Sequence, residues 1–226
     1  MLSALIHELS APVTVIEGFA ELIDVPLDEL DDATFHRAVA AIRRNASHLR
    51  GLLSVFADAR RIDVDALDLR RQPTDVGILV TEAVESLRAL VQPHPLSVDA
   101  GPGEVADVDP VRVMQALINL VQNAAKFSLP ETAIEIRVTT VDESVCVTVV
   151  DHGQGIASGH RDGVFEKFAR LQRDAPGTGL GLYISRGIAR AHGGDIVLEE
   201  SGPDGSRFSL TLPIGSPDMS EPKVNQ

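Results

Sequence analysis

Apolar residues in the first 61 positions recur every seven residues along two stretches, which an acidic segment (24–32) separates. In the first stretch the recurring positions are Leu2, Leu9, Ile16 and Ile23, with Leu5, Pro12 and Phe19 beside them. In the second they are Phe35, Ile42, Leu49 and Phe56, with Val39, Ala46 and Leu53 beside them. This spacing predicts two amphipathic helices that pack as an antiparallel hairpin. One hairpin cannot bury both of its apolar faces, so we expect a four-helix bundle in a homodimer.

From residue 62 onward the pattern changes. Residues 62–73 are polar and include Pro73, so they predict a linker. The later apolar patterns predict helices over 76–91, 109–127 and 179–192, and strands over 96–98, 134–138, 145–150, 196–198 and 208–212. These elements mix without strict alternation, which indicates an α/β sandwich with helices on one face. The predicted fold class is therefore α+β, with a hairpin (1–61), a linker (62–73), a sandwich domain (74–214) and a disordered tail (215–226).

Composition narrows the classes of function. The formal net charge of −13 argues against a general nucleic-acid or anionic-membrane surface. No apolar run reaches the length of a membrane span, so no membrane contact is expected within this chain. The only cysteine, Cys146, excludes a disulfide within the chain and indicates a reducing, cytoplasmic compartment. It lies in an apolar strand pattern and is expected to be a small buried residue.

A glycine-rich run is the most informative segment, and it comprises Gly177, Thr178, Gly179, Leu180 and Gly181. Glycines let backbone N–H groups approach an anion closely, and the run ends where a helix is predicted to begin. It is not a Walker A loop, because no Gly-Lys-Ser/Thr follows, and it is not the dinucleotide fingerprint, because Leu182 replaces the third glycine. The alternative at this point is a glycine-rich turn that binds no ligand.

Polar residues in the predicted helix 109–127 share one face. They are Arg112, Gln115, Asn119, Asn123 and Lys126, spaced three and four apart, opposite a stripe of Val113, Leu117, Leu120, Val121 and Ala124. Asparagine is a mediocre helix former, so two of them there need a reason. Amide oxygens suit a Mg²⁺ ion that bridges phosphates, and a lysine suits a phosphate. A plain solvated face is the alternative explanation.

Asp151 follows a predicted strand directly and opens the sequence Asp-His-Gly-Gln-Gly, which includes Gly153 and Gly155. A carboxylate there could accept a hydrogen bond from the exocyclic amine of adenine, although a tight Asp-Gly turn would explain the same residues. Residues 156–176 then form a long segment with few apolar residues, which predicts a mobile lid.

The order of these motifs resembles the N, G1, F and G2 boxes of sensor histidine kinases. The four boxes are Asn119-Leu-Val-Gln-Asn-Ala-Ala-Lys126-Phe, Asp151-x-Gly-x-Gly155, Phe165-Glu-Lys-Phe168 and Gly177-Thr-Gly-Leu-Gly-Leu. The resemblance implies a Bergerat-type ATP-binding fold with ATP and Mg²⁺ as cofactors. It assigns Asn123 to the metal, Asn119 to its support, Lys126 to phosphate and Asp151 to adenine. It also implies ATP-binding roles for Gly153, Gly155, Phe165, Phe168, Arg170, Gly177, Thr178, Gly179, Leu180 and Gly181.

Water-splitting ATPases, such as DNA gyrase and the mismatch-repair proteins, resemble the same region. They carry a glutamate general base one helical turn before the metal-binding asparagine, where this sequence has Asn119. An amide cannot accept a proton from water, so ATP hydrolysis is disfavoured as the main chemistry. The phosphoryl group then needs another acceptor.

His7 is the candidate acceptor. The segment His7-Glu-Leu-Ser-Ala-Pro12 resembles the phosphoacceptor box of the same kinases, and Glu8 could orient the imidazole or take its proton. The resemblance implies autophosphorylation of His7 and a response-regulator receiver domain as partner. The chain could be the cytoplasmic part of a membrane-anchored sensor. Ala11 stands where the family has a polar residue that positions water, so we expect weak phosphatase activity. Two alternatives stay open: a Ser/Thr kinase of the anti-sigma-factor type, and a pseudokinase scaffold that only binds nucleotide.

Overall fold

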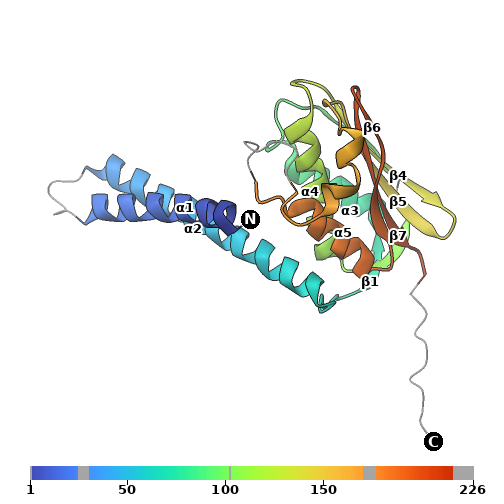
Figure 1. Ribbon diagram of the computed structural model, residues 1–226, viewed down its shortest axis with the longest axis horizontal. Helices are drawn as coiled ribbons and strands as arrows, with labels where there is room; N and C mark the ends of the chain where they lie inside the picture. The colour runs from blue at the N-terminus through green and yellow to red at the C-terminus, as the bar shows by residue number, and fades with distance from the viewer. Residues whose placement is uncertain (1, 25–30, 102, 170–176, 216–226) are drawn as a thin grey trace, which may run out of the picture.

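The computed structural model describes residues 2–24, 31–101, 103–169 and 177–215. Helices α1 (Leu2–Ile23) and α2 (Asp32–Asp63) form the antiparallel hairpin that the heptads predict (Figure 1). The Asp31 side chain caps α2 by accepting a hydrogen bond of 2.9 Å from the Thr34 backbone N–H. The second half of α2 runs past the end of α1 and reaches the sheet domain, so this helix joins both parts of the fold (Figure 1).

The rest of the chain forms an α/β sandwich around a five-stranded sheet in the order β2-β4-β5-β7-β6. The strands are β2 (Leu96–Asp99), β4 (Ile134–Val141), β5 (Ser144–Asp151), β6 (Asp195–Gly202) and β7 (Gly205–Pro213). Within this sheet, as far as the structure describes it, only β2 and β4 pair in parallel. Helices α3 (Val76–Leu87), α4 (Pro110–Phe127) and α5 (Gly181–Ala191) cover one face of the sheet (Figure 1). The predicted α+β class, with a hairpin followed by a sandwich, is therefore confirmed.

Helix α4 buries the apolar stripe that the sequence predicted. Asp109 caps it by accepting hydrogen bonds from the backbone N–H groups of Val111 and Arg112, and Pro110 occupies the first turn. The five apolar positions of the predicted stripe are all buried. The opposite face of the same helix is left to polar residues. Cys146 is also buried, in β5, as expected.

Several boundaries differ from those expected from sequence. β1 (Gln72–Asp75) and β3 (Val105–Val108) form a separate two-stranded antiparallel sheet that the sequence pattern did not reveal. Pro73 is tolerated because a two-stranded sheet offers only edge strands. α3 ends at Leu87 rather than at 91, and α5 begins at Gly181 rather than at 179. Short 3₁₀ turns, η1 (Ser158–His160) and η2 (Asp162–Phe165), occupy part of the expected lid.

A second, smaller apolar core joins the hairpin to the sandwich. Its buried members are Ala59 of α2, Ala116 of α4, and Leu180, Ile184 and Ile188 at α5, with Val55, Phe56, Ile62, Leu67, Phe168 and Tyr183 packed against them. This core lies apart from the main one between the sheet and its helices. Among the described residues, no helix is both long and apolar enough to cross a membrane.

Candidate functional site

A cavity of about 320 Å³ opens where α4, the end of β5 and the glycine run meet. Nine of the residues singled out from the sequence line it: Asn119, Asn123, Lys126, Asp151, Gly155, Gly177, Thr178, Gly179 and Gly181. They come from three separate stretches of the chain. Folding therefore gathers amide, ammonium, carboxylate and bare backbone groups around one hollow.

The polar face of α4 forms one side of the cavity. The Asn119 side-chain nitrogen donates a 2.7 Å hydrogen bond to the hydroxyl of Ser185, which is buried on α5. Gly181 lies directly against the same amide, because an added Cβ would come within 2.5 Å of the Asn119 oxygen. This contact fixes Asn119 between two helices. Asn123 and Lys126 follow at helical spacing along the cavity wall.

Asp151 is the buried carboxylate of the cavity, with only 4% of the residue exposed. Its Oδ1 atom accepts backbone hydrogen bonds from Gly153 at 3.0 Å and from Ser206 at 3.2 Å. Burial raises the pKa of this carboxyl above its usual value, and these two hydrogen bonds offset part of the rise. Asp151 is therefore an oriented acceptor in a partly desolvated place.

The glycine run passes over the cavity with backbone angles that favour glycine. Gly179 has φ +68°, and a side chain there would also collide with the backbone of Phe168 and Ala169. The run leads into the first turn of α5, where the N-cap residue Leu180 supplies no side-chain capping hydrogen bond. The first N–H groups of α5 thus resemble an anion-binding helix start.

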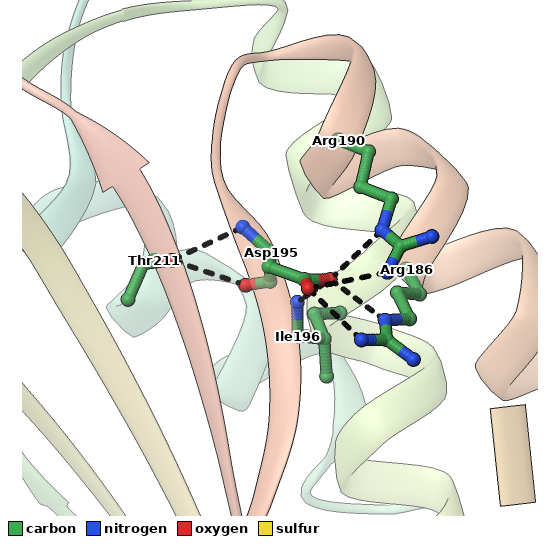
Figure 2. Close-up of polar contacts among 5 residues, drawn as sticks. All are labelled: Arg186, Arg190, Asp195, Ile196 and Thr211. Carbon is green, nitrogen blue, oxygen red and sulfur yellow. Dashed lines mark hydrogen bonds and ion pairs between the residues drawn. The ribbon is translucent and has the colours of Figure 1, made fainter. Parts of the chain in front are cut away.

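The far end of α5 is tied to the sheet, which fixes the direction of its N-terminus. The Asp195 carboxylate accepts hydrogen bonds of 2.7 and 2.9 Å from Arg186 and of 3.2 and 3.4 Å from Arg190 (Figure 2). The Asp195 backbone exchanges two hydrogen bonds with the Thr211 hydroxyl. Burial raises the pKa of Asp195, but the hydrogen bonds from both arginines outweigh it and lower the pKa to about 2. The Asp195 carboxylate therefore stays ionised across the physiological pH range.

The comparisons with known proteins agree with this geometry. Residues 108–216 match the family described as histidine kinase-, DNA gyrase B- and HSP90-like ATPases. Sensor protein KdpD of Escherichia coli is 32% identical over 94% of this chain, and the probable sensor histidine kinase TcrY of Mycobacterium tuberculosis is 31% identical over 92%. These matches include the hairpin as well as the ATPase-like domain. The chain is a sensor histidine kinase core.

Solved structures support the same assignment. Full-length ShkA, crystallised in complex with AMPPNP, matches 96% of this core with a TM-score of 0.72 and 26% identity, and the match covers 46% of ShkA. Histidine kinase AdeS of Acinetobacter baumannii matches 92% of this core and 98% of its own chain, with a TM-score of 0.68 and 22% identity, and so shares the fold. The core spans 24% of KdpD and 44% of TcrY.

Some residues singled out from the sequence do not line the cavity. Leu180 is fully buried in the smaller core, where Phe168 also packs. Phe165 packs its ring edge-on against Phe208, with centroids 6.2 Å apart, and the Arg186 guanidinium lies 4.6 Å from its centroid. Gly153 packs against the Phe127 carbonyl at the end of α4. Arg170 lies outside the described residues, as does the side chain of His7, whose backbone belongs to α1.

Other residues line the cavity although no binding role was assigned to them from the sequence: Val55, Gln122, Phe127, Gln154, Ile156, Val164, Ala169, Leu182, Ser206 and Phe208. Four of them (Gln122, Phe127, Gln154 and Leu182) lie inside the recognised motifs, so the motifs could have suggested them. Val55 is different, because it belongs to α2 of the hairpin. No local pattern in the sequence connects it to a nucleotide site.

The residues present fit ATP and Mg²⁺. The volume suits a small-molecule ligand, and the apolar residues beside Asp151 suit a base. Lys126 lies beside the glycine run, with its Nζ atom 3.7 Å from the position of a Cβ on Gly177. Within the described part of the chain, no cluster of three or more His, Cys, Asp or Glu side chains could hold a metal. Asn123 then suits an ion that is held mainly by water and phosphate oxygens.

Proposed function

We propose that this core phosphorylates its own His7 with ATP and passes the phosphoryl group to an aspartate of a response-regulator receiver domain. The cavity is the observation that carries this proposal. It joins Asn123, Lys126, Asp151 and the glycine run, and the same cavity is walled by Val55 of the hairpin that carries His7.

The offset along the hairpin axis between residue 7 and the cavity supports the proposal. Ile23 and Asp32 flank the tip of the antiparallel hairpin, so residue 7 of α1 lies near the level of His48 on α2. Val55 is seven residues further along α2, which is about 10 Å along the helix axis at 1.5 Å per residue. A cavity at that level lies within the reach of an extended triphosphate and a modest movement of the domain.

Each cavity residue has a role that its surroundings support. Asp151 accepts a hydrogen bond from the adenine amine, while Lys126 and the backbone of the glycine run contact phosphate. Asn123 would hold Mg²⁺, which when bound would neutralise part of the phosphate charge. Asn119, held by Ser185, supports this face and supplies no base for water. Catalysis is then mostly a matter of positioning.

The residues around His7 influence both the attack on ATP and the later fate of the phosphoryl group. Glu8 is the neighbouring group that would orient the imidazole or take its proton. Pro12 is buried inside α1, where it removes a backbone hydrogen bond close to His7. Ala11 is exposed and carries no polar group to position water. We therefore expect phosphorylated receiver to lose its label slowly in the presence of this core.

The hairpin supports a homodimer in the cytoplasm, where ATP is abundant. Large apolar side chains of the hairpin that remain exposed in the single chain are Val13, Val15, Leu22, Phe35 and Leu53. Pairing two hairpins into a four-helix bundle would cover such residues. In this proposal the core acts as the cytoplasmic part of a longer, membrane-bound sensor.

Incubation with γ-labelled ATP tests the proposal. Wild type should acquire label that is lost in acid and retained in base, as a phosphohistidine is, and His7→Gln should acquire none. Label that survives acid and persists in His7→Gln would instead indicate the anti-sigma-factor type of Ser/Thr kinase. Nucleotide binding without any label would indicate a pseudokinase scaffold.

A further inference from the structure

The cavity has a wall that does not belong to the ATPase-like domain. Val55 lines it from α2, one helical turn before Asp58. Residues three apart share a helix face, so Val55 and Asp58 both point toward the sandwich domain. The hairpin thus contributes directly to the space in which nucleotide is proposed to bind.

Asp58 makes a buried polar contact across the junction. Only 2% of the residue is exposed. Its Oδ2 atom accepts a 2.9 Å hydrogen bond from Arg112 Nη1 and another of 2.9 Å from Gln115 Nε2. Arg112 Nη1 also donates to the Gln115 side-chain oxygen at 3.0 Å, so the three groups form one network. A charge-assisted network with little exposure holds a definite geometry.

The partners of Asp58 belong to the nucleotide face of α4. Arg112 and Gln115 precede Asn119 and Asn123 at spacings of three and four, so they continue the same face of the helix. Asp58 therefore sets the position of α2 relative to the amides that line the cavity. Arg61 adds a weaker ion pair to Asp58 at 3.6 Å.

The glycine run is also packed against α2. Leu180, inside the run, is fully buried in the core that contains Ala59 of α2 and has Val55 packed against it. A second anchor lies further along α2, where Asp63 accepts a 2.6 Å hydrogen bond from Tyr183 and pairs with Lys167. Loss of the Asp58 network alone would therefore shift α2 rather than release it.

We propose that α2 supplies one wall of the nucleotide site and that Asp58, acting through Arg112 and Gln115, is the positioning residue that keeps this wall in place. The proposal deepens the proposed function and rests on it. Because docking of α2 completes the site, nucleotide affinity and docking are linked, and each strengthens the other. The hairpin then senses whether nucleotide is bound before any phosphoryl transfer.

A mutant cycle on the full chain tests this linkage. A fluorescent ATP analogue with Mg²⁺ is titrated into wild type, Val55→Ala, Asp58→Ala and the double variant. Val55→Ala removes two methyl groups from this wall, and loss of about one methylene's worth of contact with the ligand should weaken binding about fourfold. Asp58→Ala should weaken it at least as much. The double variant should bind like Asp58→Ala alone, because the wall is already displaced.

The control is Ser54→Ala, which changes an exposed neighbour on the same helix and should leave affinity unchanged. Urea unfolding of every variant shows whether it is folded, and Asp58→Asn, which keeps the shape of the side chain, replaces Asp58→Ala in the cycle if the latter is not. Additive effects, or wild-type affinity in both single variants, would overturn the role of α2 while leaving the kinase proposal intact. Failure of wild type to bind the analogue would instead overturn the proposed function.

Discussion

Replacing Asp151 by asparagine should change stability and nucleotide affinity in opposite directions. The folded protein raises the pKa of Asp151, chiefly through burial, so its ionised form is less favourable in the fold than in the unfolded chain. Stability is therefore lost as the pH rises through the raised pKa. Asparagine carries no charge to desolvate, and its oxygen can keep the hydrogen bonds from Gly153 and Ser206. Asp151→Asn should be at least as stable as wild type at pH 7.

Affinity should fall for a different reason. A carboxylate accepts a hydrogen bond from the adenine amine, whereas the amide nitrogen of asparagine would face that amine as a second donor. A hydrogen bond to a charged group contributes about 1.5–3 kcal/mol, so the Kd for ATP should rise roughly 10- to 150-fold. Calorimetric titration gives the Kd, and urea unfolding gives the free energy of unfolding.

Asp204→Asn is the matched control, because Asp204 is exposed in the turn between β6 and β7. It should change neither quantity appreciably. The reasoning fails if Asp151→Asn binds ATP as tightly as wild type. It also fails if affinity falls only in step with stability, since the residue would then be structural.

Three further predictions concern the surrounding fold. Tyr183 is the only tyrosine and the chain has no tryptophan, so phenolate absorbance reports it alone; burial, then its hydrogen bond to Asp63, raises its pKa to about 12, and Asp63→Asn should lower the midpoint of that titration. Gly155 has φ +66°, and a Cβ there would lie 1.9 Å from the Gly202 oxygen. Gly155→Ala should therefore lower the free energy of unfolding in urea by about 2 kcal/mol, whereas Gly159→Ala, in open space, should lower it little. His192 is held by two hydrogen bonds: its Nε2 accepts the Asp109 N–H at 2.9 Å, and its Nδ1 lies 2.8 Å from the Ile188 oxygen. Because burial lowers its pKa, the unfolded chain binds the proton more readily than the folded one. The free energy of unfolding should therefore fall between pH 7.5 and 5.5 more steeply in wild type than in His192→Asn.

Periodicity predicted the parts of the fold whose burial is decided locally. The heptads in residues 1–61 produced the hairpin, and the stripe from Val113 to Ala124 produced the buried face of α4. In both cases one helix face is apolar along its whole length. β1 was not predicted because Gln72-Pro-Thr-Asp has no alternation of apolar and polar residues. It becomes a strand only by pairing with β3.

The sequence predicted only the part of the cavity that the ATPase-like domain contributes. Asn119, Asn123, Lys126 and Asp151 belong to motifs whose residue types suggest phosphate, metal and adenine. Arg112 was noted only as part of the polar face of its own helix, and Asp58 looks like an ordinary solvated residue, because nothing in either local pattern shows that the two helices meet. Contacts between distant elements are set by docking, which no local period records.

Leu180 shows how docking and the nucleotide site share one segment. Within residues 177–181, Leu180 is the residue that does not line the cavity, and it is fully buried against α2 and α5 instead. The glycines on either side let the backbone face the ligand while this side chain anchors the run in the smaller core. A shift of α2 would therefore move the backbone groups that are proposed to hold phosphate. A glycine-rich loop without this leucine could bind an anion, but its position would not be coupled to the position of the hairpin.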